Sequence, residues 1–366
     1  MTARNRTQFH PLTVAGVERI TDDAVAITFD MPGELRELFD FTAGQHLTIR
    51  HHLDGQELRR TYSICAPQGH GLVRVAVKRL DGGAFSGYAN GRLRPGDVLD
   101  VMPPLGSFHP RIHTAPPRPR HHVAIAAGSG ITPVLSLLAT ILEREPHGSV
   151  TLVYGNRTAA DIMFLEELED IKNRYPQRFT LLNVLSREQQ EAPLVSGRID
   201  AAKLDALMDT VTPPGGVDEW YLCGPHGLIE TAREALRTRR VEAERIHQEL
   251  FHAGDEPPPP VRRAGARETA GAGNKSNVTF TLDGRTASVD VDPSAETVLT
   301  AVLRTRADVP YACRGGVCGT CRAKLTSGRI EMDRNYALET DERATGYVLT
   351  CQSRPATEQV TLDYDS

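Results

Sequence analysis

Four cysteines near the end of the chain are spaced so that their sulfurs could hold a metal centre. Cys313, Cys318 and Cys321 follow the pattern C-x4-C-x2-C, and a distant fourth cysteine stands at position 351. This is the spacing of plant-type [2Fe–2S] clusters. Residues 314–317 include two glycines, so their backbone can bend around a cluster and direct amide N–H groups at sulfur. The spacing therefore predicts a [2Fe–2S] centre.

Zinc and buried free thiols are the alternatives for this group of cysteines. Structural zinc sites usually use two pairs of closely spaced cysteines, whereas Cys351 has no close partner in the sequence. The spacing thus favours iron and sulfide over zinc. Six cysteines in 366 residues are too few for a disulfide scaffold, which indicates a reducing compartment. We expect Cys65 and Cys223 to be small buried residues.

A second group of residues could hold an aromatic cofactor that carries a pyrophosphate. Arg60, Tyr62 and Ser63 lie at the end of a predicted strand. An arginine can pair with a pyrophosphate, a tyrosine ring can lie flat on an aromatic ring, and a serine hydroxyl can bond a ring nitrogen. A strand-end arginine beside a core tyrosine has the same appearance, so this motif needs support from elsewhere.

A glycine-rich segment further along the chain supplies that support. Gly83 and Ser86 follow a predicted strand that ends at Val77 and Lys78, and they open a predicted short helix. Free backbone N–H groups at the start of a helix bind phosphate. The two segments together therefore support one cofactor site.

A glycine turn in the middle of the chain could bind a second dinucleotide. Residues 128–133 read Gly-Ser-Gly-Ile-Thr-Pro between a predicted strand and a predicted helix. Gly128 and Gly130 allow a diphosphate to approach the backbone, and the start of the helix favours anions. Pro133 stands near the first helical position, where a missing N–H costs nothing. Because Pro133 replaces the third glycine of G-x-G-x-x-G, this segment alone is a weak sign of a dinucleotide site.

Three kinds of structure are expected to position these motifs. Residues 11 to about 110 contain many short apolar runs between glycine and proline turns, which predicts a small antiparallel barrel with hairpin turns at residues 54–55 and 95–97. From about residue 120, strands alternate with helices, which predicts a parallel sheet with crossovers. A compact third domain begins at Val278, with two strands around residues 283–284.

A proline-rich segment with almost no large apolar residues separates the last two domains. The expected boundaries are residues 1–112 for the barrel, 113–253 for the α/β domain, 254–276 for the linker and 277–366 for the cysteine-rich domain.

Composition excludes several other classes of protein. The chain is 40% hydrophobic and 24% charged, as globular domains are, and its net charge of −5 gives no general basic field for nucleic acid. We expect no signal peptide, because the N-terminus leads into polar residues. Residues 123–142 carry no charge, but a glycine turn interrupts them, so we expect a strand, a turn and a helix and not a membrane span. The expected location is the cytoplasm.

In this order, the motifs resemble the ferredoxin–NADP reductase superfamily. The resemblance implies a multi-domain chain with an antiparallel FAD barrel, an α/β parallel-sheet nucleotide domain and an α+β β-grasp ferredoxin domain. It implies FAD contacts at Arg60, Tyr62, Ser63, Val77, Lys78, Gly83 and Ser86. It implies nicotinamide-site residues at Gly128, Gly130, Thr132, Pro133, Cys223, Gly224 and Pro225. It also implies that Glu249 and Phe251 lie beside the flavin ring, and that the cluster ligands are Cys313, Cys318, Cys321 and Cys351.

Charge distinguishes between the two nicotinamide cofactors. An acidic residue at the end of the second strand of the α/β domain would select the ribose 2′-hydroxyl of NADH. Here Arg157 follows that strand, and the next strand is followed by Ser186 and Arg187, which suit a 2′-phosphate. We therefore expect NADPH rather than NADH. The alternative is that both arginines are solvated surface residues.

The expected electron path runs from NADPH through FAD and the [2Fe–2S] cluster to an external acceptor. A nicotinamide delivers two electrons as a hydride and a cluster accepts one at a time, so a flavin between them is needed. We expect no side chain to act as a catalytic nucleophile. Arg314 and Arg322 flank the cluster loop and are either docking residues or solvated side chains.

The domain order resembles that of reductases that feed oxygenases. Within this group, residues 57–65, 310–318 and 347–352 carry a closer resemblance to reductases of a di-iron oxygenase that epoxidises the ring of phenylacetyl-CoA. The alternatives are the reductase of a Rieske-type ring or steroid hydroxylase, a non-enzymatic redox sensor with a flavin and a cluster, and a zinc-stabilised scaffold. No nucleic acid or membrane partner is expected.

Overall fold

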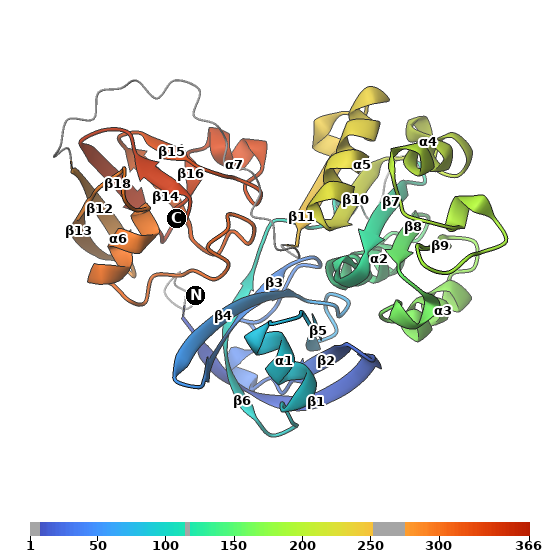
Figure 1. Ribbon diagram of the computed structural model, residues 1–366, viewed down its shortest axis with the longest axis horizontal. Coiled ribbons are helices and arrows are strands. Elements are labelled where there is room, and N and C mark those ends of the chain that lie inside the picture. The colour runs from blue at the N-terminus through green and yellow to red at the C-terminus, as the bar shows by residue number, and fades with distance from the viewer. Residues whose placement is uncertain (1–7, 114–117, 252–274) are drawn as a thin grey trace.

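The chain folds around three main sheets and a small two-stranded one. Each main sheet packs on hydrophobic residues, and one further cluster of buried residues is shared by the first two domains. The computed structural model describes residues 8–113, 118–251 and 275–366. In Figure 1 the N-terminal sheet lies below the other two, which stand side by side above it.

The N-terminal sheet is a closed antiparallel barrel. Its strands follow the order β4-β3-β6-β1-β2-β5, and a bridge between Ile64 and Val75 joins the two edges. The strands are β1 (His10–Thr21), β2 (Ala24–Phe29), β3 (His46–Leu53), β4 (Gln56–Ser63), β5 (Val73–Lys78) and β6 (Val98–Leu105). One helix, α1 (Ala84–Gly91), lies between β5 and β6. Closure leaves both ends of the barrel available for cofactor-binding loops.

The expected turns of the barrel are confirmed in one case and wrong in the other. Asp54 and Gly55 both have positive φ, as a two-residue hairpin requires, and they connect β3 to β4. Residues 95–97 do not form a hairpin, because α1 and not a strand precedes them; they form a turn into β6.

The middle of the chain forms a parallel sheet with the order β11-β10-β7-β8-β9. The strands are β7 (His121–Ala127), β8 (Ser149–Asn156), β9 (Phe179–Leu185), β10 (Glu219–Gly224) and β11 (Ile246–Leu250). The helices are α2 (Ile131–Arg144), α3 (Leu165–Arg174), α4 (Ala201–Thr210) and α5 (His226–Thr238). The strand order reverses between β7 and β10, and ligands bind at the carboxyl ends of strands at such a point.

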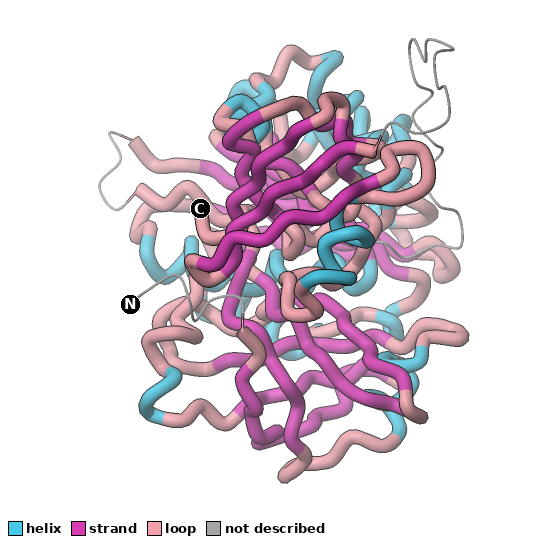
Figure 2. Tube along the Cα trace, turned by 90° about the vertical axis from the view of Figure 1, so that its left-hand side faces the viewer, coloured by secondary structure: helices cyan, strands magenta, loops and turns pink. Residues whose placement is uncertain are grey.

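The C-terminal domain has a mixed sheet with the order β13-β12-β18-β14-β16 and a two-stranded sheet, β15-β17. Only β12 and β18 run parallel within the mixed sheet. The strands are β12 (Ser276–Leu282), β13 (Arg285–Val291), β14 (Arg322–Ser327), β15 (Ile330–Met332), β16 (Tyr347–Leu349), β17 (Ser353–Pro355) and β18 (Gln359–Asp363), and the helices are α6 (Val298–Thr305) and α7 (Thr340–Ala344). Figure 2 shows this sheet above the barrel.

The expected fold class is confirmed: an antiparallel barrel, an α/β domain with a parallel sheet and an α+β domain follow one another along the chain. The uncharged residues 123–142 form most of β7, a 3-10 turn and most of α2, as expected. In the described parts of the chain, no helix is both long enough and apolar enough to span a bilayer. Residues 254–274 of the expected linker lie outside the described residues, and its last residue, Ser276, begins β12.

Candidate functional site

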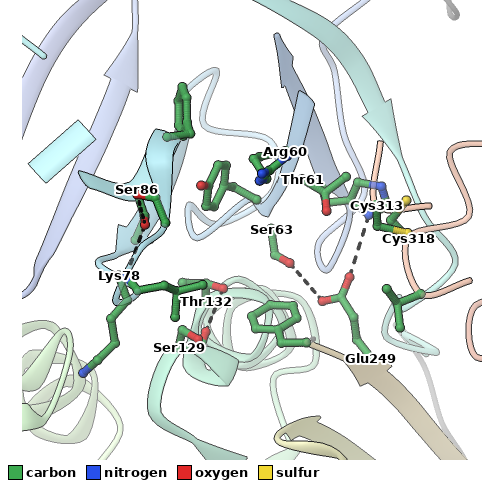
Figure 3. Close-up of a pocket in the computed structure, with 18 of the residues that line it drawn as sticks. Arg60, Thr61, Ser63, Lys78, Ser86, Ser129, Thr132, Glu249, Cys313 and Cys318 are labelled. Atoms are coloured by element: carbon green, nitrogen blue, oxygen red, sulfur yellow. Dashed lines mark hydrogen bonds and ion pairs between the residues drawn. The ribbon is translucent and has the colours of Figure 1, made fainter. Parts of the chain in front are cut away.

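A cavity of about 420 Å³ lies where the three domains meet, within the size range of cofactor sites. Its walls come from the barrel, the start of α1, the first turn of α2, the end of β11 and the cysteine loop. The expected site residues among its lining are Arg60, Tyr62, Ser63, Lys78, Gly83, Ser86, Thr132, Glu249, Phe251, Cys313 and Cys318. Motifs from three separate parts of the sequence therefore converge on one space (Figure 3).

A hydrogen bond between two domains crosses the floor of this cavity. The buried Ser63 hydroxyl donates to Glu249 Oε2 over 2.9 Å, as Figure 3 shows. The other oxygen of Glu249 lies 3.8 Å from Nδ1 of His46. His46 is also buried, and its Nε2 has no hydrogen-bond partner among the described residues. One buried ring nitrogen of this cavity-lining residue is therefore unsatisfied by the described protein groups.

The turn before α1 has no room for a side chain at Gly83. A Cβ there would lie 2.4 Å from Ser86 Oγ and 3.1 Å from the Leu80 carbonyl oxygen. Ser86 Oγ accepts from the Leu80 N–H and donates to the Gly83 carbonyl, so it holds the turn in shape. Gly83 is the N-cap residue of α1, and no side chain accepts a hydrogen bond from the first N–H groups of the helix. These N–H groups can therefore bind an anion.

The two expected nicotinamide motifs touch each other at the switch point of the parallel sheet. A Cβ on Gly130 would lie 2.2 Å from the Cys223 carbonyl oxygen, so only glycine lets the two turns approach this closely. Gly128 has a φ of +53°, and its carbonyl accepts from the Tyr154 hydroxyl over 2.9 Å. Thr132 donates to the Ser129 carbonyl. The backbone between β7 and α2 is therefore fixed from both sides.

Cys223 is fully buried, and burial raises the pKa of its thiol well above the usual value. It therefore stays protonated and is a poor nucleophile.

The other expected residues of these two turns lie at the starts of helices. Pro133 is buried in the first turn of α2, and Gly224 and Pro225 lead from β10 into α5.

The three residues expected to select the nicotinamide cofactor lie side by side. Arg157 follows β8, and Ser186 and Arg187 follow the neighbouring β9. The Arg187 N–H donates to the Arg157 carbonyl over 2.7 Å. All three side chains are exposed. The acidic residue beside them, Glu188, accepts from the Ala159 N–H.

The four C-terminal cysteines form two pairs. A hydrogen bond with the Cys318 thiol, helped by the backbone N–H of Gly315, lowers the pKa of Cys313 to about 5 despite burial, and the same contact raises the pKa of Cys318. Contact with Cys321 likewise lowers the pKa of Cys351. In the described ranges no three His, Cys, Asp or Glu side chains are arranged to hold one metal ion. Two pairs suit a centre with two irons, each held by two thiolates.

The loop around the cysteines directs further polar groups at sulfur. The Thr320 hydroxyl donates to Cys318 Sγ over 3.2 Å, and the Gln352 amide lies 3.7 Å from Cys351 Sγ. Gly316 has a φ of +79°, and a Cβ there would lie 3.0 Å from Gln352 Cγ. Hydrogen bonds to sulfur stabilise the charge that a cluster gains on reduction.

Family models match each domain in turn. They are an oxidoreductase FAD-binding domain at residues 11–109, an oxidoreductase NAD-binding domain at 124–234, and a 2Fe-2S iron-sulfur cluster binding domain at 280–356. A component of the 1,2-phenylacetyl-CoA epoxidase of Escherichia coli (strain K12) is 44% identical to this chain over 98% of it and 99% of its own length. The chain belongs to the reductase components of monooxygenases within the ferredoxin–NADP reductase superfamily.

A second relative is also similar over nearly its whole length, and solved structures share the fold. The ferredoxin reductase component of the 3-ketosteroid-9-alpha-monooxygenase of Rhodococcus rhodochrous is 32% identical over 96% of both chains. Among solved structures, phthalate dioxygenase reductase has a TM-score of 0.59, with 24% identity over 99% of this chain and all of its own. An intact type IV self-sufficient cytochrome P450 monooxygenase has a TM-score of 0.70, with 24% identity over 97% of this chain and 41% of its own. These two structures share the fold.

As a reductase of this family, the chain has FAD-binding, NAD-binding and [2Fe–2S] domains, as the sequence predicted. The cavity fits a flavin, because an uncapped helix start and a half-buried tyrosine line one space. The cysteine loop fits a two-iron cluster, because its thiols are paired and receive hydrogen bonds. The 2Fe-2S model match also favours iron over zinc.

Some features of the site could not be found in the sequence. His46 lines the cavity, but a single histidine in a predicted strand carries no signal of such a role. Val77 was expected to contact FAD; its side chain lies in the barrel core and its carbonyl accepts from Asn90. The sequence pattern cannot show that Ser63 reaches a residue 186 positions away.

We expect Cys351→Ser to remove the cluster and leave the flavin, because one iron would lose one of its two thiolates. Iron and acid-labile sulfide analysis, together with the electron paramagnetic resonance signal after reduction, measures this loss. The matched control is Cys65→Ser, since Cys65 is buried in the barrel and donates to the Arg74 carbonyl. Full iron content in the Cys351 variant would contradict the assignment.

We expect Gly130→Ala to raise the KM for the nicotinamide cofactor and to lower the free energy of unfolding by about 1–3 kcal/mol, because its Cβ would overlap the Cys223 carbonyl. Steady-state kinetics and denaturant unfolding measure the two effects. Gly215→Ala in the same domain is the control, since its Cβ would meet nothing within 4 Å. Equal behaviour of the two variants would show that the close approach is unimportant.

Proposed function

We propose that this chain is the reductase component that passes electrons from NADPH, through FAD and a [2Fe–2S] cluster, to a di-iron oxygenase acting on phenylacetyl-CoA. One observation carries the proposal: Cys313 and Cys318 line the same cavity as Arg60, Tyr62 and Ser63. Cluster ligands and flavin-binding residues therefore face each other. The 44% identity to the 1,2-phenylacetyl-CoA epoxidase component supports the choice of oxygenase.

When bound, the cofactors would supply the redox chemistry: NADPH would give a hydride, which with one proton reduces FAD, and the two electrons would leave singly through the cluster with release of two protons. The protein binds and orients the reactants. Arg60 and the start of α1 supply positive charge and N–H groups for phosphates, whereas the Lys78 ammonium is paired with Asp23 over 3.2 Å. Ser63 donates its only proton to Glu249, so its oxygen can accept a hydrogen bond from a ring N–H in the cavity.

The proposed nicotinamide site lies at the touching turns of residues 128–133 and 223–225. Thr132 and Phe251 line the cavity beside them, which supports a nicotinamide site next to the proposed flavin site. We assign the cluster to Cys313, Cys318, Cys321 and Cys351. The proposed 2′-phosphate site is the exposed group Arg157, Ser186 and Arg187.

A second candidate is a steroid hydroxylase reductase, which the 32% identity to the 3-ketosteroid-9-alpha-monooxygenase component favours. It uses the same electron path with another oxygenase. The redox sensor has no such support, since the relatives are reductase components.

We expect Arg187→Ala to raise the KM for NADPH about 10-fold or more and to leave the KM for NADH nearly unchanged, because only NADPH carries the phosphate that this charge would bind. Steady-state kinetics with both cofactors measures the effect. Arg233→Ala, an exposed arginine on α5, is the control. Equal effects of Arg187→Ala on both cofactors would remove the case for NADPH.

We expect the holoprotein to couple NADPH oxidation to epoxidation of phenylacetyl-CoA when it is combined with the other components of a phenylacetyl-CoA oxygenase. Product formation per NADPH, followed by mass spectrometry, is the measurement. A 3-ketosteroid oxygenase in place of that partner is the comparison. Coupling with the steroid system alone would favour the second candidate, and no reduction of the cluster by NADPH would reject both.

A further inference from the structure

We propose that Arg59, a barrel residue outside the cofactor cavity, is the positioning residue that docks the [2Fe–2S] domain and holds its cluster loop against the flavin. This inference rests on the proposed electron path. Arg59 and Arg60 are neighbours on β4, and successive side chains of a strand point to opposite faces. Arg60 lines the cavity, whereas Arg59 contacts the [2Fe–2S] domain.

Arg59 is a nearly buried charge whose partners are divided between two domains. It is 7% exposed. Within the barrel, its Nε donates to Glu57 Oε1 over 2.8 Å. Across the interface, its Nη1 donates to the Val309 carbonyl over 3.4 Å, and its guanidinium carbon lies 4.0 Å from the centre of the Tyr311 ring. A buried charge needs hydrogen-bond or cation–π partners. The contact of Arg59 with the Val309 carbonyl and the Tyr311 ring is therefore a specific interaction between the two domains.

The contacted segment leads directly to the cluster. Tyr311 stands two residues before Cys313, whose side chain lines the cavity. Arg314, the residue after that cysteine, also lies over the Tyr311 ring, at 4.5 Å. A movement of Tyr311 would therefore displace the cysteine relative to the cavity. Arg322, by contrast, is paired with Glu342 inside its own domain.

A second contact joins the neighbouring barrel strand to the other cavity-lining cysteine. Oγ1 of Thr48 on β3 lies 3.3 Å from Oγ1 of Thr320, and both residues are buried. The Thr320 hydroxyl donates to Cys318 Sγ, and a hydroxyl has one proton, so Thr48 is the donor between the two threonines. The pairing of β3 with β4 thus presents two anchors, one for each cysteine-bearing segment that faces the cavity.

Both anchors use polar side-chain groups. Arginine and tyrosine are also the residues that most often carry the energy of an interface. A few strong contacts then decide where the domain docks.

The test compares Arg59→Ala with Arg50→Ala in the holoprotein. Arg50 is the control, because it lies opposite Arg59 in the β3–β4 ladder and shares the Phe9 ring with it, but its side-chain partners among the described residues, Asp100 and Phe9, are both on the barrel side. Hydrogen–deuterium exchange measures docking directly. We expect amides within residues 309–312 to exchange about 10-fold faster in Arg59→Ala, as the loss of one desolvated cation–π contact implies. Arg50→Ala should leave this exchange unchanged.

Stopped-flow spectroscopy gives the second measurement. In Arg59→Ala we expect unchanged flavin reduction by NADPH and cluster reduction that is about 3- to 10-fold slower, because only the second step needs the docked domain. Iron content and the electron paramagnetic resonance signal should be unchanged, which separates docking from cluster loss. Should Arg59→Ala fold poorly, Arg59→Lys keeps the charge and loses the flat stack, and it should show the same pattern.

Variants of the ring complete the test. Tyr311→Phe keeps the stacking face and should behave as the unsubstituted protein, whereas Tyr311→Leu should reproduce Arg59→Ala, and the double variant should add nothing further. Unchanged exchange at residues 309–312 in Arg59→Ala would overturn the proposal. Failure of NADPH to reduce the cluster in the unsubstituted protein would overturn the proposed function instead, and the exchange comparison stands in either case.

Discussion

The hydrogen bond from Ser63 to Glu249 joins the barrel to the last strand of the parallel sheet, and the cofactor cavity depends on this junction. The barrel and the [2Fe–2S] domain each contain a hydrophobic core, but a further cluster of buried residues is shared by the barrel, with Ala43 and Cys65, and the α/β domain, with Leu137 and Tyr221. The cavity lies where the three domains meet. A buried hydroxyl and a carboxylate that satisfy each other fix the spacing there more sharply than apolar contact could, since hydrogen bonds are directional.

The opposite end of the parallel sheet is held by a buried charge network. Arg120 lies between Glu145 and Glu219, and each carboxylate also accepts from a histidine. Although burial opposes ionisation, the hydrogen bond from His247 and the charge of Arg120 lower the pKa of Glu219. Arg120 also donates to the carbonyl of Arg111 in the connection from the barrel. This network therefore fixes how the first two domains are joined, away from the redox chemistry.

The close packing and sharp bending of backbone turns are the second constraint on the site. A Cβ at Gly83 would overlap Ser86 Oγ, and a Cβ at Gly130 would overlap the Cys223 carbonyl, so both turns need glycine for space. At Gly128 and Gly316 the requirement is a positive φ. The glycines are therefore not interchangeable: some permit contact, and others permit a bend that directs N–H groups toward a ligand.

The sequence by itself determined the local chemistry: the cysteine spacing, the glycine turns, the alternation of strands and helices, and the hairpins at residues 54–55 and 283–284. These are properties of neighbouring residues, and short-range sterics and hydrophobic periodicity decide them. Only the tertiary structure decided which side chains meet. It linked Ser63 to Glu249, brought His46 into the cavity, used the Ser86 hydroxyl to hold its own turn and directed Arg59 to the [2Fe–2S] domain while its neighbour Arg60 lines the cavity. Such contacts depend on how the three domains pack, and sequence spacing does not record that packing.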